Sequence, residues 1–454
     1  MRAALAGKEQ DYTQAPLNRA IVLLAIPMVL EMCMESLFGI VDIFFVARLG
    51  AEAAAAVGVT ETLMTVVYSV AMGIALATTA MVARRIGEQD TEGAARAAVQ
   101  AIILGIGAAV AVGVPAVWRA PDLLKVMGAD EQVIAGGVAY TQLVLGSAVS
   151  VMLLFLINAI FRGAGDAAVA MRVLWFANGL NILLDPILIF GLGPIPAMGV
   201  AGAGLATLIG RTAGVVMQVV ILTRGRGRIA LAARHWRLDW KVLRRLSRVS
   251  STGMAQFLIA NASWLALVRI IAASGAAALA GYAIAIRIVI FSLLPSWGLS
   301  NAAATLVGQN LGARRPDRAE SSVWRTGVFN MVFLGVVGLL FIAAPEPLVL
   351  QFTNDAEVAR YAVNCLRIVS YGYVFYALGM VLVQAFNGAG DTTTPTLINV
   401  GVYWMLQIPV AWWLALELGW GANGAFWAIP IAESALTITG WWIFRKGKWK
   451  LQRI

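Results

Sequence analysis

The stretch FRGAGD at residues 161–166 recurs as FNGAGD at residues 386–391, 225 positions further along the chain. The same separation relates three more pairs of residues: Gly50 and Gly275, Gly87 and Gly312, and Asp130 and Asp355. Four loops in one register indicate that the chain contains an internal duplication. A separation of 222 positions relates GVAG at 199–202 to GANG at 421–424, which indicates a short deletion near the end of the second copy.

The composition excludes most soluble proteins and most enzymes. Of the 454 residues, 60% are hydrophobic and only 13% are charged, whereas soluble proteins are about one quarter charged. There are too few charges to cover soluble cores. With two cysteines, Cys33 and Cys365, and one histidine, His235, neither a disulfide framework nor a zinc or iron–sulfur site can be built. We therefore expect no enzyme and no cofactor.

Twelve apolar stretches have the length of about 20 residues that a membrane-spanning helix needs. They lie within 21–47, 57–83, 97–118, 133–158, 171–192, 200–223, 250–272, 278–306, 324–344, 359–385, 396–416 and 424–444. Six spans in each copy predict two bundles related by a pseudo-two-fold axis along the membrane normal. The sequence thus predicts an all-α integral membrane protein with an N-terminal lobe (1–223), a basic linker (224–249) and a C-terminal lobe (250–454).

The basic residues predict the orientation of these spans. If the N-terminus is cytoplasmic, 26 of the 34 lysines and arginines lie in cytoplasmic segments. Only four lie on the opposite side: Arg48, Arg119, Lys125 and Arg360. This bias predicts a multi-pass protein of the cell inner membrane with both termini cytoplasmic. Because the net charge of +10 then reports topology, we expect contact with lipids and no nucleic-acid partner; we also expect a monomer.

Three acids share one stripe of the first span. Glu31, Glu35 and Asp42 lie within about 40° of one another on a helix. Since a charge at the centre of a membrane helix costs about 2.5–3.5 kcal/mol, the stripe faces a cavity or partner groups rather than lipid. Alternatively, these carboxyl groups only tie helices together.

Complementary polar groups occur in the fifth and sixth spans. Asn181 and Asp185 are four residues apart and so share one helix face, and Thr207 follows a run of small residues. With Asp42 they offer two carboxylates, an amide oxygen and a hydroxyl, which suit a hard cation such as Na⁺. The two carboxylates could instead share one proton.

The acids are confined to the first copy. At the repeat separation Asp42 corresponds to Leu267 and Glu31 to Gln256, while Asp185 aligns with Ile408. This asymmetry favours function over generic packing. Further candidates for the lining of a central cleft complete the set: Glu31, Glu35, Glu61, Tyr68, Gln256 and Arg287. Arg211 and Glu433 occupy matching positions and either pair within a bundle or line the cleft.

Taken together, these motifs resemble the multidrug and toxic compound extrusion (MATE) transporters, and in particular the DNA-damage-inducible-type branch. The resemblance rests on the pattern from Pro27 through Asp42 to Gly50, the twin loops, LVGQNLG at 306–312, and Asn181 with Asp185 and Pro186. It implies twelve helices in two lobes and alternating access. It also implies a coupling site for H⁺ or Na⁺ formed by Asp42, Asn181, Asp185 and Thr207.

The function expected on this basis is secondary antiport, in which a small organic compound or drug, often cationic, is exported in exchange for H⁺ or Na⁺. The alternative is a flippase for lipid-linked precursors on the same fold. A flippase would need a basic cleft to hold phosphates, and the three acids of the first span disfavour it.

Overall fold

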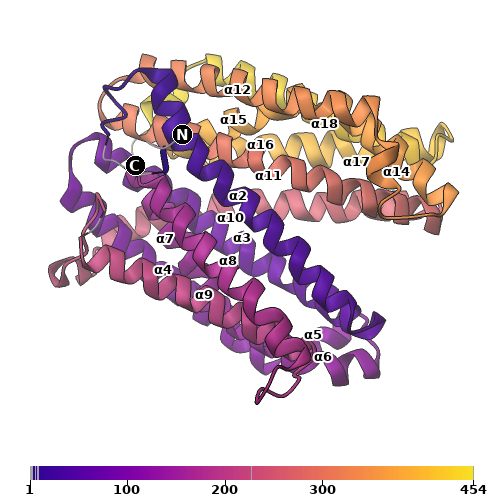
Figure 1. Ribbon diagram of the computed structural model, residues 1–454. Helices are drawn as coiled ribbons and strands as arrows, with labels where there is room; N and C mark the ends of the chain where they lie inside the picture. Colours follow the sequence, from indigo (N-terminus) through magenta and orange to yellow (C-terminus); the bar gives the residue numbers. More distant parts are fainter. Residues whose placement is uncertain (1–3, 6, 8–9, 226, 453) are drawn as a thin grey trace.

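The computed structural model describes residues 4–5, 7, 10–225, 227–452 and 454, and these form helices and loops without a β-strand. The N-lobe consists of α2 (Leu17–Ala47), α3 (Ala51–Gly87), α4 (Thr91–Trp118), α5 (Ala120–Val126), α6 (Glu131–Gly146), α7 (Ala148–Ala164), α8 (Ala167–Phe190) and α9 (Val200–Thr223). Figure 1 shows these helices as one bundle, apart from the bundle of the second half.

The C-lobe repeats this order. It consists of α10 (Trp240–Ala272), α11 (Ala276–Gly312), α12 (Pro316–Ala343), α13 (Glu346–Val349), α14 (Ala356–Tyr371), α15 (Tyr373–Ala389), α16 (Thr393–Asn399), the π-helical segment η2 (Val400–Gln407), α17 (Ile408–Trp412), the π-helical segment η3 (Trp413–Glu417) and α18 (Ala422–Arg445). Two short 3₁₀ helices, η1 (Ala233–Trp236) and η4 (Lys448–Leu451), lie in the linker and at the C-terminus.

The helices confirm the predicted membrane architecture. Within the described residues, ten helical segments are long and apolar enough to span a bilayer. The pair α14 and α15, bent by 58° at Gly372, makes the eleventh span. The 24-residue α18 completes the C-lobe as the twelfth, because at 1.5 Å per residue it is as long as α9 in the same position of the N-lobe.

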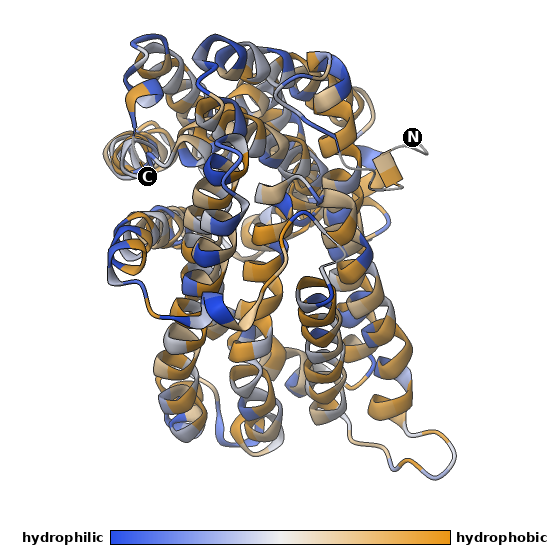
Figure 2. Ribbon diagram, turned by 90° about the vertical axis from the view of Figure 1, so that its left-hand side faces the viewer, coloured by the Kyte–Doolittle hydropathy of each residue, from blue (hydrophilic) through white to orange (hydrophobic). Residues whose placement is uncertain are grey.

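Large apolar side chains point outward along the spans. Leu265 on α10, Leu339 on α12 and Val114 on α4 are each more than half exposed. In Figure 2 hydrophobic residues dominate the helices along their length, and hydrophilic residues gather toward the loops. Contiguous exposed apolar surface of this kind is suited to lipid.

The contacts between the lobes obey the predicted pseudo-two-fold symmetry. α3 packs on α10, and α2 packs on α11. A Cβ added to Gly73 of α3 would lie 2.5 Å from Met254, and one added to its repeat mate Gly298 of α11 would lie 2.5 Å from the Met28 carbonyl oxygen. Such close helix approach requires glycine at both positions.

The lobes are joined firmly at the end that carries the termini. There Gly87 and Gly312, also repeat mates, face each other; a Cβ on Gly87 would lie 2.0 Å from the Gln309 carbonyl oxygen. Gln309 also donates from Nε2 to the Gly163 carbonyl oxygen at 3.0 Å, across the two lobes. Figure 1 shows the two bundles diverging from this end, where both termini lie.

The segment 224–249, which the sequence predicts to be a basic linker, includes the beginning of α10. α10 begins at Trp240 because Asp239 caps its N-terminus, with Oδ1 accepting hydrogen bonds from the backbone N–H of Lys241 at 3.0 Å and Val242 at 3.2 Å. Residues 240–249 therefore form the first turns of a 33-residue helix, and the basic segment continues directly into the C-lobe.

Candidate functional site

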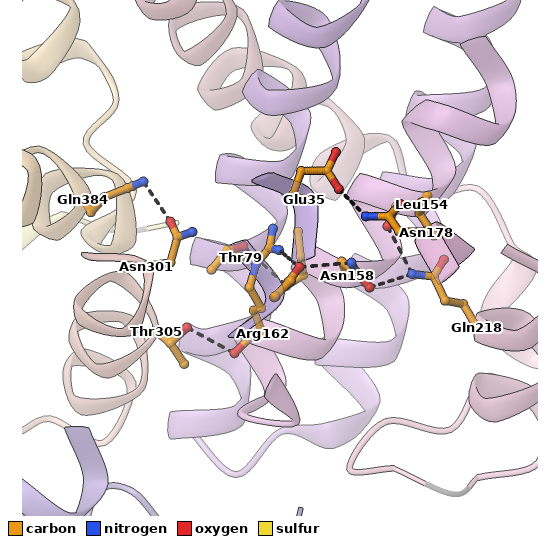
Figure 3. Close-up of polar contacts among 12 residues, drawn as sticks. Glu35, Thr79, Leu154, Asn158, Arg162, Asn178, Gln218, Asn301, Thr305 and Gln384 are labelled. Carbon is orange, nitrogen blue, oxygen red and sulfur yellow. Dashed lines mark hydrogen bonds and ion pairs between the residues drawn. The ribbon is translucent and has the colours of Figure 1, made fainter. Parts of the chain in front are cut away.

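Glu31 on α2 is held in a buried ion pair. Its side chain is 1% exposed, and Oε1 accepts hydrogen bonds from Arg162 Nη1 at 2.8 Å and Asn158 Nδ2 at 3.1 Å. Both partners lie on α7, and Figure 3 shows the side chains of Asn158 and Arg162 near each other. This arrangement fits the helix-tying alternative, because Glu31 does not line the cavities described below, whereas its partner Arg162 lines one of them. The second carboxylate oxygen of Glu31, Oε2, is buried without a hydrogen-bond partner in the described residues.

Glu35, one turn further along α2, is also paired. Its Oε1 accepts from Arg211 Nη2 at 3.0 Å, and its Oε2 accepts from Asn178 Nδ2 at 2.8 Å. The Arg211 guanidinium carbon in turn lies 5.1 Å from the ring centre of Phe38. Arg211 thus neutralises Glu35, an acid of its own lobe. A buried charge left without a partner would be strongly destabilising.

The four residues expected to bind the coupling ion come together in the N-lobe. Asn181 Nδ2 donates to Thr207 Oγ1 at 3.1 Å, which joins α8 to α9. Asp185 on α8 is completely buried, and Asp42 on α2 is half-buried. The carboxylates of Asp42 and Asp185 interact electrostatically. We call these four residues the N-lobe acid site.

This site contains oxygen atoms that have no hydrogen-bond partner. Both carboxylate oxygens of Asp185 and the amide oxygen of Asn181 are buried without a hydrogen-bond partner in the described part of the protein. A buried acceptor that makes no hydrogen bond costs about 1–3 kcal/mol, and more when the acceptor is charged. A proton on Asp185, or a small cation held by these oxygens, would remove that cost. The site holds two carboxylates, and no cluster of three or more metal-ligating acid, cysteine or histidine side chains occurs in the described residues.

Two of the remaining candidates lie beside this site. Glu61 on α3 is exposed and interacts electrostatically with Asp42. Tyr68, two turns further along α3, packs edge-on against Phe155 with ring centres 6.1 Å apart. Arg287 on α11 is exposed and lies outside the cavities described below, so the structure does not bring it to the other candidates.

A cavity of about 250 Å³ lies between the lobes. The N-lobe contributes Glu35, Tyr68 and Arg162 to its walls, and the C-lobe contributes Trp297 and Gln384. Figure 3 shows the hydrogen bond from Gln384 to Asn301 opposite the Glu35 and Arg162 networks. We call this space the interlobe cavity; it is where a substrate would be in reach of both lobes.

A larger cavity of about 410 Å³, the C-lobe cavity, lies among α10, α11, α15, η2 and α18. Gln256 and Glu433 line it, together with many aromatic side chains. This cavity could not be anticipated from the sequence, because its aromatic residues come from four segments that are far apart along the chain: α10, α11, α15 and η2. The available signal was Glu433, an acid in an apolar span whose repeat mate is the basic Arg211.

Comparisons with known proteins agree with this architecture. The model of the MatE family matches residues 27–187 and 254–413, one match in each lobe. A probable multidrug resistance protein, NorM, of Thermotoga maritima is 26% identical over 96% of this chain and 94% of its own. An FAD transporter of Shewanella oneidensis is 24% identical over 95% of each chain.

A solved structure has the same fold over almost the whole length. It is described as the outward-facing conformation of a multidrug resistance MATE family transporter of the MOP superfamily. Its TM-score is 0.90 at 26% identity, and the match covers 97% of this chain and 98% of that one.

Fold and site define a multi-pass membrane transporter for small molecules rather than an enzyme. The chain belongs to the MatE family of transporters, whose model matches each of the two lobes.

Proposed function

We propose that this protein is a secondary active antiporter that exports small organic compounds in exchange for H⁺ or Na⁺. The observation that carries the proposal is the N-lobe acid site. It has buried, unpartnered oxygens on Asp185 and Asn181 in one of two otherwise duplicated lobes. Because only one lobe contains such a site, an ion has one place to bind in the transport pathway. The duplicated scaffold allows the two lobes to move relative to each other.

The mechanism follows from which groups the ion would neutralise. With both termini cytoplasmic, the firm contacts around Gly87 and Gly312 close the cytoplasmic side, and ions reach Asp42 and Asp185 from the other side. Neutralising the two acids removes their repulsion and lets α2 and α8 approach. Because Glu35 on α2 lines the interlobe cavity, this movement alters the substrate's surroundings.

Exchange requires that ion and substrate weaken each other's binding. By linkage, an ion that lowers substrate affinity by a given factor has its own affinity lowered by the same factor. The two ligands need not touch, since α2 carries both Asp42 and the cavity residue Glu35.

The names of relatives support export of small molecules. Several are described as probable multidrug resistance proteins, including the NorM proteins of Thermotoga maritima and Pseudomonas aeruginosa. A lipid-precursor flippase is not favoured, because the walls of the C-lobe cavity contain no lysine, arginine or histidine that would hold a phosphate.

The test measures ethidium efflux from proteoliposomes in which all copies of the protein have the same orientation. Na⁺ and H⁺ gradients are imposed one at a time. We expect one of the two gradients to drive ethidium transport by the wild-type protein. Asp42→Asn, which keeps the size of the side chain but removes its charge, should abolish the gradient's effect.

Asp122→Asn provides the matched control. Asp122 is an exposed acid of the same lobe, and within the described part of the chain it forms one ion pair, with Arg119 at 3.6 Å on the surface. Its substitution should leave efflux unchanged. Efflux that ignores both gradients, or gradient-driven efflux of full size in Asp42→Asn, would overturn the proposal.

A further inference from the structure

The charge inside the C-lobe cavity is a single buried acid. Glu433 on α18 is 7% exposed, and its Oε1 accepts one hydrogen bond, from the Tyr403 hydroxyl at 3.1 Å. Throughout the described chain it takes part in none of the ion pairs, and the cavity walls carry no basic side chain. A buried carboxylate without a cation is costly, and one hydrogen bond offsets only part of that cost.

The matching position in the N-lobe shows that Glu433 lacks a counter-ion within its own lobe. Arg211, the repeat mate of Glu433, is neutralised within its own lobe by Glu35 at 3.0 Å. Glu433 has no such internal counter-ion. The partner of its charge must therefore come from outside the protein as a proton or a cationic ligand.

The walls of the cavity are suited to a cation with an organic body. Seven aromatic rings line it: Phe257, Trp264, Tyr282, Trp297, Tyr373, Tyr376 and Tyr403. Aromatic faces attract cations, and the attraction grows when the cation is desolvated. Trp297 stacks on Phe257 with ring centres 6.0 Å apart, so one flat surface is already assembled.

A small inorganic cation fits this cavity poorly. Hard cations need about six oxygen ligands at short distance. Here Glu433 supplies the only carboxylate, and most of the wall is aromatic or aliphatic. The volume of about 410 Å³ falls within the range of about 300–1,000 Å³ typical of drug-sized ligands. Gln256 Oε1, buried and unpartnered, adds a hydrogen-bond acceptor for an N–H of such a ligand.

We propose that the C-lobe cavity is a binding site for an aromatic organic monocation, with Glu433 as its counter-ion and the surrounding aromatic rings as its cage. This inference rests on the proposed function. It gives the exported compound a binding site that is separate from the N-lobe acid site. Phe257, Trp297 and Gln384 line both this cavity and the interlobe cavity, so the two cavities are adjacent.

The experiment measures equilibrium binding to the purified full-length protein in detergent, without any gradient. The probe is ethidium, a flat aromatic monocation that fluoresces when it leaves water, and its comparator is the uncharged phenanthridine. The wild-type protein should bind ethidium more tightly than phenanthridine. Glu433→Gln, which keeps an acceptor for Tyr403, should raise the Kd of ethidium about tenfold or more and leave that of phenanthridine nearly unchanged.

Two further variants bracket this result. Glu433→Asp keeps the charge and should retain most of the preference for ethidium. Glu417→Gln removes an exposed acid from the same lobe and should leave both Kd values as in the wild-type protein. An unchanged ethidium Kd in Glu433→Gln would overturn the proposal.

A second measurement needs no variant at all. Photolysis of ethidium azide bound to the wild-type protein, followed by peptide mapping, should label α10, α11, η2 or α18 within the C-lobe. Labelling confined to N-lobe peptides would also overturn the proposal. The outcomes separate this inference from the proposed function. If an ion gradient drives efflux but ethidium binding does not depend on Glu433, only the proposed C-lobe site is wrong. If binding depends on Glu433 but no gradient affects efflux, only the proposed antiport is wrong.

Discussion

The two lobes share a backbone plan but differ in where they keep charge. In the N-lobe, Glu31 and Glu35 are paired with Arg162 and Arg211, and both carboxylate oxygens of Asp185 are buried without a hydrogen-bond partner in the described residues. In the described part of the C-lobe, the repeat mates of these ion-paired residues form no ion pair, and one acid, Glu433, lines an aromatic cavity. The two lobes therefore share the contacts that shape the scaffold but differ in their polar interiors.

A comparison of individual repeat mates shows which charged and polar groups of the N-lobe the C-lobe lacks. Glu31 corresponds to Gln256, Arg162 to Asn387, Asn158 to Val383 and Thr60 to Ala285. Each replacement removes a charge or a hydrogen-bonding group. Removing both members of an ion pair together avoids leaving one of them buried alone.

The largest effect is expected from breaking the Glu31 pair. Arg162→Met leaves Glu31 as a buried charge without its cation and should destabilise the protein by about 3–5 kcal/mol. Thermal unfolding in detergent measures this loss. Adding Glu31→Gln should restore much of the stability.

The matched control is Asn387→Met, the same replacement at the repeat mate. Asn387 makes one side-chain hydrogen bond as a donor, at 3.3 Å to Gln384, so the cost should be about 1 kcal/mol. Equal losses for Arg162→Met and Asn387→Met would show that the charge pair does not distinguish the lobes.

Removing the buried acid of the N-lobe acid site should affect coupling more than folding. Asp185→Asn keeps the shape of the side chain and supplies a donor where an ion or proton would sit. We expect gradient-driven ethidium efflux to fall about 100-fold, within the range of typical coupling energies, with an unfolding temperature close to that of the wild-type protein. Wild-type efflux in this variant would remove Asp185 from the coupling site.

The interlobe glycines test the symmetry itself. Gly87→Ala and Gly312→Ala should have similar effects, because the added Cβ would lie 2.0 Å from the Gln309 carbonyl oxygen in one case and 2.2 Å from that of Arg84 in the other. Overpacking of this kind costs about 1–3 kcal/mol and should slow efflux by hindering closure at the end with the termini.

Gly58→Ala on the same helix, α3, is the control, because an added Cβ there meets nothing within 4 Å. Efflux should remain normal and stability should rise slightly. A strong effect at Gly87 with none at Gly312 would argue that the two ends of the contact are not equivalent.

The smallest effect is expected from converting an N-lobe hydrogen bond to its C-lobe form. Thr60 and Thr141 join their hydroxyls at 2.8 Å, and their repeat mates are the buried residues Ala285 and Leu366. The double variant Thr60→Ala, Thr141→Leu removes both partners together, so unfolding should shift by less than about 1 kcal/mol. A larger loss would show that this hydrogen bond contributes more than its C-lobe counterpart suggests.

The sequence predicted the scaffold well because membrane spans and repeats are local signals. Recognising twelve apolar stretches and a repeat requires no knowledge of tertiary contacts, and the structure has a helical segment at each of the twelve stretches. The close contacts of the repeated glycines between the lobes were not predicted. The stripe formed by Glu31, Glu35 and Asp42 was equally visible, because helical periodicity alone places residues on one face.

Partner choice could not be predicted, since it depends on helix packing. Arg162 belongs to a loop motif in the sequence, yet it reaches Glu31 on another helix at 2.8 Å. The aromatic C-lobe cavity was missed for a similar reason, because the residues that line it are distant in sequence.

The central claim is that an ion in the N-lobe acid site weakens substrate binding elsewhere in the protein. The most direct measurement is the Kd of ethidium for the purified wild-type and Asp42→Asn proteins, titrated separately with Na⁺ and with acid. We expect one of these cations to raise the wild-type Kd, and the increase to be much smaller in Asp42→Asn, where only direct competition at Glu433 remains. An equal dependence in both proteins would contradict the account.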